Sequence, residues 1–176
     1  EKGMYWNTRA DDLIVKAMIG LLERNPSLPK ERVDDVAIAA TTQQGDQGLT
    51  LGRTAAILAG LPLSVPGYAI DRMCAGAMTS VTTTAGAIAF GAYDVAIAGG
   101  VEHMGRHPMG FGADPNPRFL AEKLVSADAL NMGLTAERLH DRFPQLTKER
   151  ADRFGMRSQQ KVAAAYAAGK IQPDLV

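Results

Sequence analysis

The stretch from residue 75 to residue 93 carries no charge and consists mainly of glycine, alanine, serine and threonine. A helix here is apolar or small on every side, so neighbouring elements are expected to cover it all round. Short, mostly apolar runs suited to buried strands lie at residues 36–41, 68–72 and 94–98, and a short helix is predicted over 53–59. The resulting order of strand, helix, strand, helix, strand indicates parallel pairing with right-handed crossovers. The sequence therefore predicts an α/β layered domain with a mostly parallel sheet.

Two further helices are expected outside this alternation. The predicted helix at residues 10–24 has an apolar face made of Leu13, Ala17, Met18, Leu21 and Leu22. Thr147 is placed to cap a helix over 148–168, which Gly169 ends. Between residues 100 and 131 the composition changes to glycine, proline and polar residues, which indicates a long connection.

The composition excludes several classes of protein. Nineteen basic and nineteen acidic residues cancel without forming blocks, which argues against a nucleic-acid-binding or membrane-attracted surface. The single cysteine excludes an internal disulfide and a zinc ribbon, and it fits a reducing, cytoplasmic location. The uncharged run approaches the length of a membrane span but has few large aliphatic residues, so it is interpreted as a helix of a soluble core.

Cys74 is that single cysteine, and it lies where the strand predicted at 68–72 gives way to the uncharged helix. A thiol at the start of a helix lies near backbone N–H groups that have no intrahelical acceptor, which favours the thiolate. A free cysteine is also among the most buried residue types and often behaves as a small apolar residue. Position alone leaves both interpretations open.

Four segments follow one another in an order and spacing typical of one enzyme family. They are residues 68–78 around Cys74, Asp-Val-Ala-Ile-Ala-Gly-Gly-Val-Glu-His-Met at 94–104, Asn-Met-Gly-Leu-Thr-Ala-Glu at 131–137, and Ser-Gln-Gln-Lys at 158–161 followed by Ala-Gly-Lys at 168–170. With these motifs in register, the chain resembles the N-terminal portion of the thiolases, most clearly from Gly45 onward.

The resemblance implies a thiolase-like layered α/β fold with a mostly parallel sheet and a buried central helix, incomplete in this chain. Residues 1–103 would form the N-terminal thiolase domain without its first strand, and residues 104–176 an incomplete loop region that covers the substrate. The C-terminal domain would be absent. In the thiolases that domain supplies the histidine that activates the nucleophile, a second cysteine and an Asn-Glu motif, so these groups would be absent too. The isolated 176 residues are therefore expected to be inactive, whereas the full-length protein is expected to be an acyltransferase.

The same resemblance implies that Cys74 accepts the acyl group from a thioester and that its backbone N–H contributes to an oxyanion hole. Met132 matches a methionine that lines the acyl pocket, although an ordinary core methionine fits equally well. The implied reaction is thiolytic cleavage of 3-oxoacyl-CoA, as in beta-oxidation of fatty acids, or the reverse condensation. CoA would be a substrate, and no cofactor or metal is expected. The alternatives are a non-catalytic thiolase-like lipid carrier or assembly subunit and a relative of the β-ketoacyl synthases.

The implied partners, besides acyl-CoA and CoA, are other copies of the chain. The strand predicted at 68–72 resembles the edge strand through which thiolase subunits pair, so a homodimer or a dimer of dimers is expected. Other fatty-acid oxidation subunits are further candidate partners, whereas nucleic acid and a membrane span are not expected.

His103 and His107 are four residues apart, which is the spacing of a metal pair on one helix face. No acidic residue lies between them and Pro108 follows at once, so neither a helix nor a metal pair is predicted. We expect His103 to make a structural hydrogen bond near the site and His107 to occupy an exposed loop. Gly99 and Gly100 are interpreted as small residues where a crowded strand ends.

Several positions depart from the usual thiolase pattern and leave the acyl-chain preference open. Asp71 and Thr50 stand where asparagine is common, and Asn131 stands where short-chain thiolases often carry histidine. Gly76 and Ala77 replace a common serine-containing pair. Two interpretations are open for three basic side chains: contact with the CoA phosphates, or simple exposure to solvent. These side chains are Arg106, Arg118 and Lys123.

Overall fold

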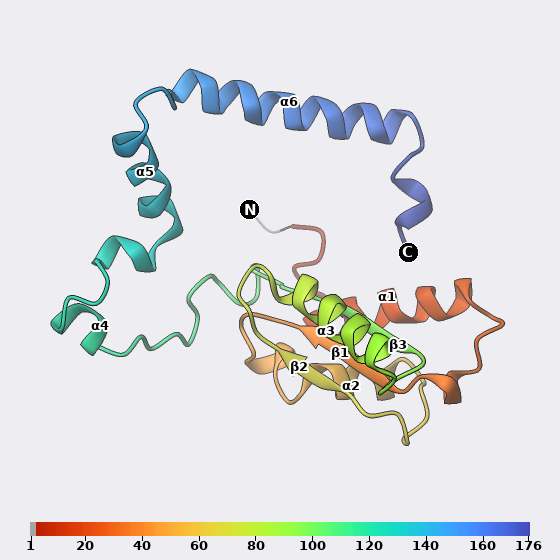
Figure 1. Cartoon of the computed structure of the whole chain (residues 1–176). Coiled ribbons are helices and arrows are strands. Elements are labelled where there is room, and N and C mark those ends of the chain that lie inside the picture. The colour runs from red at the N-terminus through yellow and green to blue at the C-terminus, as the bar shows by residue number, and fades with distance from the viewer. Residues whose placement is uncertain (1–2) are drawn as a thin grey trace. The chain divides into compact units, whose positions relative to one another are not determined.

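The computed structural model describes residues 3–176, which divide into two compact units. The first runs through Ala113 and also takes in Val176, and the second spans Asp114–Leu175. Figure 1 shows the elements of each unit along the chain. The predicted domain boundary near Met104 falls inside the first unit.

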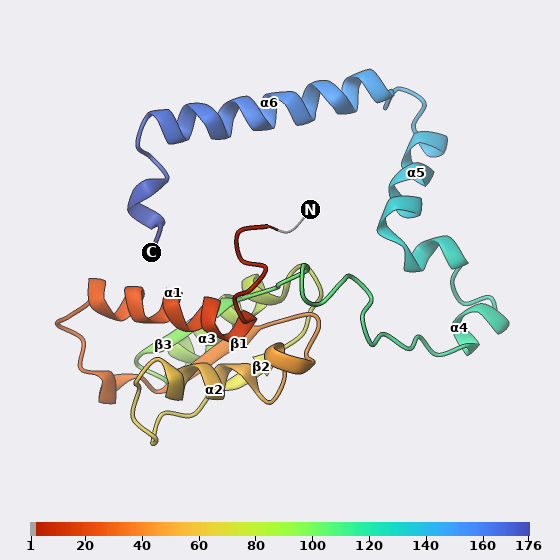
Figure 2. The same ribbon diagram turned by 180° about the vertical axis from the view of Figure 1, so that it is seen from behind.

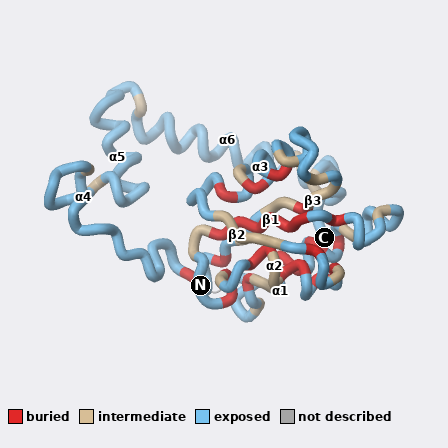
Figure 3. The backbone as a smooth tube through the Cα atoms, turned by 60° about the horizontal axis from the view of Figure 1, so that its bottom comes forward, coloured by how far each residue is buried: buried red, intermediate tan, exposed pale blue. Residues whose placement is uncertain are grey.

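Three strands form an all-parallel sheet in the first unit, in the order β2-β1-β3. The elements are α1 (Ala10–Arg24), the 3-10 helix η1 (Lys30–Arg32), β1 (Asp35–Ala39), the 3-10 helix η2 (Gly45–Gln47), α2 (Leu51–Leu58), β2 (Tyr68–Ile70), α3 (Gly76–Phe90) and β3 (Ala96–Gly100). α3 covers one face of the sheet and α1 with α2 the other, as Figures 2 and 3 show from two further sides. The predicted α/β layered fold with a parallel sheet is confirmed, with small shifts at the ends of the elements.

The hydrophobic core lies between the sheet and the layer of α1 and α2. β1 is buried along its whole length, and Val36 and Ile38 pack in this core with Leu51 of α2. α2 comes closest to the sheet at Gly52, where a Cβ atom would lie 2.2 Å from the carbonyl oxygen of Tyr68 and 2.4 Å from that of Val36. Only glycine permits this approach, so the sequence of α2 fixes how near the helix lies to the sheet.

The buried face of α1 differs from the predicted one. Of the predicted face, Met18 is buried and Leu22 packs against the core, whereas Ala17 and Leu21 are exposed. Ile14 and Val15, which were not predicted, are buried beside Met18. The helix contains two apolar stripes at helical spacing, and periodicity alone does not indicate which of them meets α2.

α3 was expected to be covered all round, but within the described residues it buries one narrow face. Ser80 and Thr84 lie on that face, where the Ser80 hydroxyl donates to the carbonyl oxygen of Gly99 at 3.0 Å. The apolar side chains that remain exposed are Met78, Val81, Ile88 and Phe90. By length and composition alone, the segment Met73–Phe90 is long and apolar enough to cross a membrane. This is weak evidence for a membrane span, because the core helix of a soluble protein passes the same test.

The second unit consists of helices joined by short connections: α4 (Arg118–Ala121), the 3-10 helix η3 (Ala127–Leu130), α5 (Met132–Arg142), α6 (Lys148–Ala167) and the 3-10 helix η4 (Gln172–Asp174). Thr147 caps α6 by accepting a hydrogen bond from the amide of Arg150, and Gly169 follows the helix with a φ of +67°, as predicted. α5 begins at Met132, where the side chain of Asn131 caps it by accepting a hydrogen bond from the amide of Leu134 at 3.2 Å.

Candidate active site

Cys74 lies in a tight turn between β2 and α3, two residues before the first residue of the helix, and is exposed. Met73 holds the turn in the left-handed region with a φ of +48°, a conformation that costs a non-glycine residue about 1 kcal/mol or more. The carboxylate of Asp71 stabilises the turn by accepting a hydrogen bond from the amide of Met73 at 2.8 Å. The local sequence thus presents the thiol at the surface of the sheet edge, and the interpretation of Cys74 as a buried small apolar residue is wrong.

The helix start behind the thiol is left without a side-chain cap. Ala75 occupies the cap position, its side chain makes no capping hydrogen bond, and the first turn of α3 contains no acidic residue. The first amides of a helix have no intrahelical acceptor, and their partial positive charge favours an anion. The turn therefore places an exposed sulfur next to a helix start whose amides are not capped by a side chain.

The start of α3 rests on the carboxyl ends of β1 and β3. A Cβ atom on Gly76 would lie 2.9 Å from the Cβ of Ala39, and one on Gly100 would lie 3.0 Å from the Cβ of Ala77. Small residues are required at this junction, as expected for Gly100; a Cβ on Gly99 would meet nothing within 4 Å. The position of the thiol is therefore linked to the ends of both neighbouring strands.

A buried amide and a carboxylate join the segments that follow these two strands. Gln47 is fully buried; its Nε2 donates to Glu102 at 2.8 Å, and its Oε1 accepts from the amide of His103 at 2.7 Å. Glu102 also accepts from the amide of Thr41 at 2.7 Å. Partial burial raises the pKa of Glu102, but the hydrogen bonds from Gln47, Thr41 and the neighbouring Thr42 outweigh it and hold the pKa below its ordinary value.

A second carboxylate, Asp46, forms a buried ionic cluster next to this pair. It binds Nε2 of His107, Nε of Arg106 at 2.9 Å and the amide of Ala10 at 3.1 Å. Burial opposes ionisation of Asp46, but the hydrogen bonds from His107 and Ala10 with the charge of Arg106 prevail and lower its pKa. The cluster ties the start of α1 and the loop after β1 to the segment after β3.

These contacts correct one expectation about the histidines and confirm another. His107 is buried and bound to Asp46, so the predicted exposed loop position is wrong. His103 does make a structural hydrogen bond, from its Nε2 to the carbonyl oxygen of Tyr5 at 2.8 Å. Over residues 3–176 no group of three metal-ligating side chains forms.

Asp46, Gln47 and Glu102 were not singled out from the sequence. The available signal was their place, since Gln47 follows β1 and Glu102 follows β3, and the carboxyl ends of parallel strands meet at one edge of a sheet. Burial of a polar residue through a distant partner leaves no periodic pattern in the sequence.

Comparison with known proteins decides the family. A model of the thiolase N-terminal domain matches residues 1–176. The chain belongs to the thiolase family. It is 40% identical over 176 residues to a 3-ketoacyl-CoA thiolase of Saccharophagus degradans, covering 100% of this chain and 44% of that protein. A 3-ketoacyl-CoA thiolase of Pseudoalteromonas translucida is 40% identical over 174 residues, with 99% and 44% covered.

A solved structure agrees with this assignment. The acetyl-CoA acetyltransferase of Bacillus anthracis matches with a TM-score of 0.80 at 28% identity, over 99% of this chain and 46% of that one. The thiolase resemblance and its layered α/β fold are confirmed. The chain spans less than half the length of the relatives it matches.

The other side chains considered for substrate binding are one methionine and three cations. Arg106 lies in the first unit, where its Nε is bound to Asp46, and the others lie in the second unit. Met132 is the first residue of α5 and is exposed, so it is not an ordinary core methionine within its unit. Arg118 binds the carboxylate of Glu122, and Lys123 has a φ of +55° in a turn. Cys74 and Met132 belong to different units, and their roles in one site stay a prediction.

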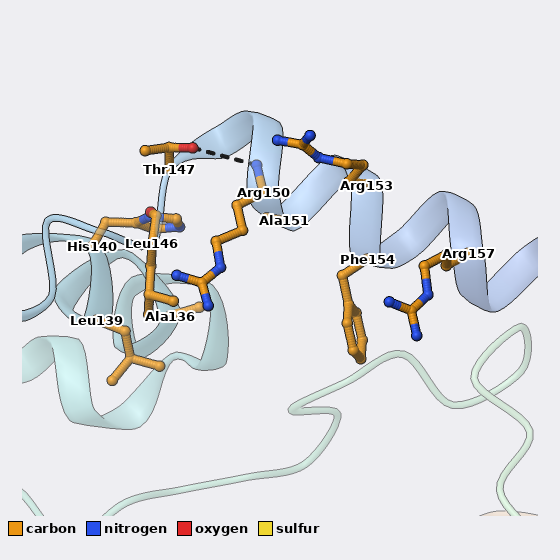
Figure 4. Close-up of a pocket in the computed structure, with 10 residues that line it drawn as sticks. All are labelled: Ala136, Leu139, His140, Leu146, Thr147, Arg150, Ala151, Arg153, Phe154 and Arg157. Carbon is orange, nitrogen blue, oxygen red and sulfur yellow. Dashed lines mark hydrogen bonds between the residues drawn. The ribbon is translucent and has the colours of Figure 1, made fainter.

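A hollow lies between α5 and α6 in the second unit (Figure 4). Its lining residues are Ala136, Leu139, His140, Leu146, Thr147, Arg150, Ala151, Arg153, Phe154 and Arg157. Arg150, Phe154 and Arg157 extend from one side of α6 in the close-up, whereas Arg153 points to the other. Nδ1 of His140 is bound to the carbonyl oxygen of Leu146, which closes the connection between the two helices.

Proposed function

We propose that the full-length protein is an acyl-CoA C-acyltransferase that cleaves 3-oxoacyl-CoA with CoA, or runs the reverse condensation, through an acyl group on Cys74. The observation that carries the proposal is the exposed thiol in a turn at the uncapped start of α3, in a chain of the thiolase family. The named relatives are 3-ketoacyl-CoA thiolases, which favours this reaction over that of a β-ketoacyl synthase or a non-catalytic lipid carrier.

In the cleavage direction the Cys74 thiolate attacks the 3-keto carbon of the substrate. The carbonyl oxygen becomes an oxyanion, and the amides at the start of α3, that of Cys74 included, are the proposed donors to it. The bond between C2 and C3 then breaks, the acetyl-CoA fragment leaves as an enolate and takes up a proton, and the acyl group stays on sulfur. Attack by the thiol of CoA releases the shortened acyl-CoA and restores Cys74.

This chemistry needs a base that removes the thiol proton and an acid that protonates the enolate. The three histidines of the chain each use a ring nitrogen in a hydrogen bond, His103 and His140 to backbone oxygens and His107 to Asp46. We propose that the base and a second cysteine come from the rest of the full-length protein. Because a thiol accepts the acyl group and CoA is a substrate, the reaction requires no resident cofactor or metal.

We further propose assembly through β2, in a cytoplasmic protein. Within residues 3–176, β2 pairs with β1 on one side only and forms an edge of the sheet, and its residues are half-buried. An open edge strand is a hazard unless another strand or element covers it. A second copy pairing at β2 would do so, and a monomeric mass in solution at micromolar concentration would contradict this assembly.

The reaction is tested with the full-length protein by thiolysis of acetoacetyl-CoA, followed through the loss of its enolate absorbance. Cys74→Ala is expected to reduce kcat by about 1000-fold or more, because the group that carries the acyl intermediate is removed. Thr82→Ala, which changes an exposed hydroxyl on α3 that bonds only within its own helix, is the matched control and should retain activity. Turnover that survives Cys74→Ala would overturn the proposal.

A further inference from the structure

The segments that follow the three strands meet at the carboxyl edge of the sheet, and one of them carries the thiol. β2 leads into the turn of Cys74, β1 into the loop of residues 40–50, and β3 into residues 101–107. The start of α3 has little freedom of its own there, because Gly76 packs on Ala39 and Ala77 lies against Gly100. Whatever fixes the ends of β1 and β3 therefore also fixes the turn of Cys74.

The Gln47–Glu102 pair, defined by these two side chains, makes that connection. The two amide hydrogens of Gln47 go to Glu102 and to the carbonyl oxygen of Thr42, the latter at 2.9 Å, and its oxygen accepts from His103. Both polar atoms of this buried side chain are thus used: the bonds to Glu102 and His103 join the loop after β1 to the segment after β3, and the bond to Thr42 holds the loop itself. Glu102 holds the first residue after the buried run of β1 through the amide of Thr41.

We infer that Gln47 and Glu102 are positioning residues for the Cys74 nucleophile. They act through the ends of β1 and β3, on which the first turn of α3 rests. Loss of the pair would let these ends separate and would tilt the uncapped amides away from the sulfur and from the oxyanion. A displacement of about 1 Å at a reacting group is enough to reduce the rate by about 100-fold. The inference rests on the proposed function, because it assigns the pair a role in acylation of Cys74.

The opposite end of the same sheet offers a control of matched chemistry. There the Tyr93 hydroxyl donates to the carboxylate of Asp35 at 2.6 Å, which joins the segment before β3 to the start of β1. Tyr93→Phe removes this hydrogen bond at the opposite end of the sheet from the turn of Cys74, whereas Glu102→Gln changes an acceptor at the same end as that turn. A variant that only weakens the sheet should behave alike at both ends.

The experiment measures single-turnover acylation of Cys74 by acetyl-CoA in the full-length wild-type, Glu102→Gln and Tyr93→Phe proteins, together with melting temperatures. Glu102→Gln is expected to slow acylation by about 10-fold or more with an unchanged KM, and Tyr93→Phe to leave it within about twofold. Equal rates in the two variants, or a wild-type rate in Glu102→Gln, would overturn the inference.

A second readout does not depend on activity and separates this inference from the proposed function. Amide hydrogen exchange at residues 74–77 should accelerate in Glu102→Gln and stay at the wild-type level in Tyr93→Phe. If wild-type protein forms no acyl adduct, the proposed function fails, and the exchange data still decide whether the pair positions the turn. Unchanged exchange at residues 74–77 in Glu102→Gln would overturn the positioning itself. If Glu102→Gln proves unstable, Glu102→Asp replaces it, because aspartate keeps the charge on a shorter side chain. Its acylation rate should be lower than that of Tyr93→Phe, and its amide exchange at residues 74–77 should be faster.

Discussion

The two compact units of the chain are stabilised in different ways. The first contains every buried side chain of the described residues, with a core of β1, α1 and α2 and a polar network behind the thiol turn. The second contains no buried residue between Asp114 and Leu175, and α5 and α6 are supported by caps and short-range ion pairs. Helices of this kind depend on packing against other elements for most of their stability. Cys74, the proposed nucleophile, thus lies on the unit that has its own core.

The largest expected effect comes from truncating that core. In the 176-residue chain, Leu51→Ala removes a side chain that is 1% exposed and should lower the free energy of unfolding by about 2–5 kcal/mol. Phe154→Ala truncates a side chain in the second unit that is 77% exposed and should change it by no more than about 0.5 kcal/mol. Chemical denaturation measures both. Equal losses would show that the second unit also packs cooperatively, and the comparison would fail.

A smaller effect is expected from the buried ionic cluster. Asp46→Asn should destabilise the first unit by about 2 kcal/mol near pH 7, because it removes hydrogen bonds to a charged group. Since the pKa of Asp46 is lowered on folding, its contribution is present above the pKa of the unfolded chain and is lost as the pH falls through the folded value.

The difference between wild type and Asp46→Asn should therefore shrink as the pH falls below about 4. Denaturant midpoints across this range provide the measurement, with the exposed Asp114→Asn as the control. A difference that grows on acidification would contradict the assigned sign.

The smallest effect is expected at the cap of α6. Thr147→Ala should destabilise the first turn of α6 by about 1 kcal/mol, because it removes the acceptor for the Arg150 amide. Amide exchange of residues 148–152 should accelerate while that of β1 stays unchanged. Ser158→Ala, in the interior of the same helix, serves as the control, and a matching acceleration there would exclude capping as the cause.

Features that depend on residues close together in the sequence could be predicted. Strands and helices followed from periodicity and from glycine at helix ends, such as Gly169 with its φ of +67° after α6. The turn of Cys74 could be placed because a strand signal adjoined a helix signal. The thiolase motifs then added the role of that residue.

Features set by distant partners could not be predicted in this way. His107 was expected in an exposed loop because Pro108 follows it and argues against a helix, yet it is buried by a partner, Asp46, that lies 61 residues away. The buried face of α1 was misassigned because a helix with two apolar stripes needs α2 to choose between them. The Gln47–Glu102 pair joins two loops over 55 residues and has no local pattern.

The central claim is that the exposed thiol at the start of α3 is the acyl acceptor. Intact-mass measurement of the full-length protein after mixing with acetyl-CoA, followed by peptide mapping, tests it directly. The account predicts one acetyl adduct per chain on the peptide containing Cys74, and none in Cys74→Ala. An adduct that persists in the alanine variant, or that maps to another residue, would contradict it.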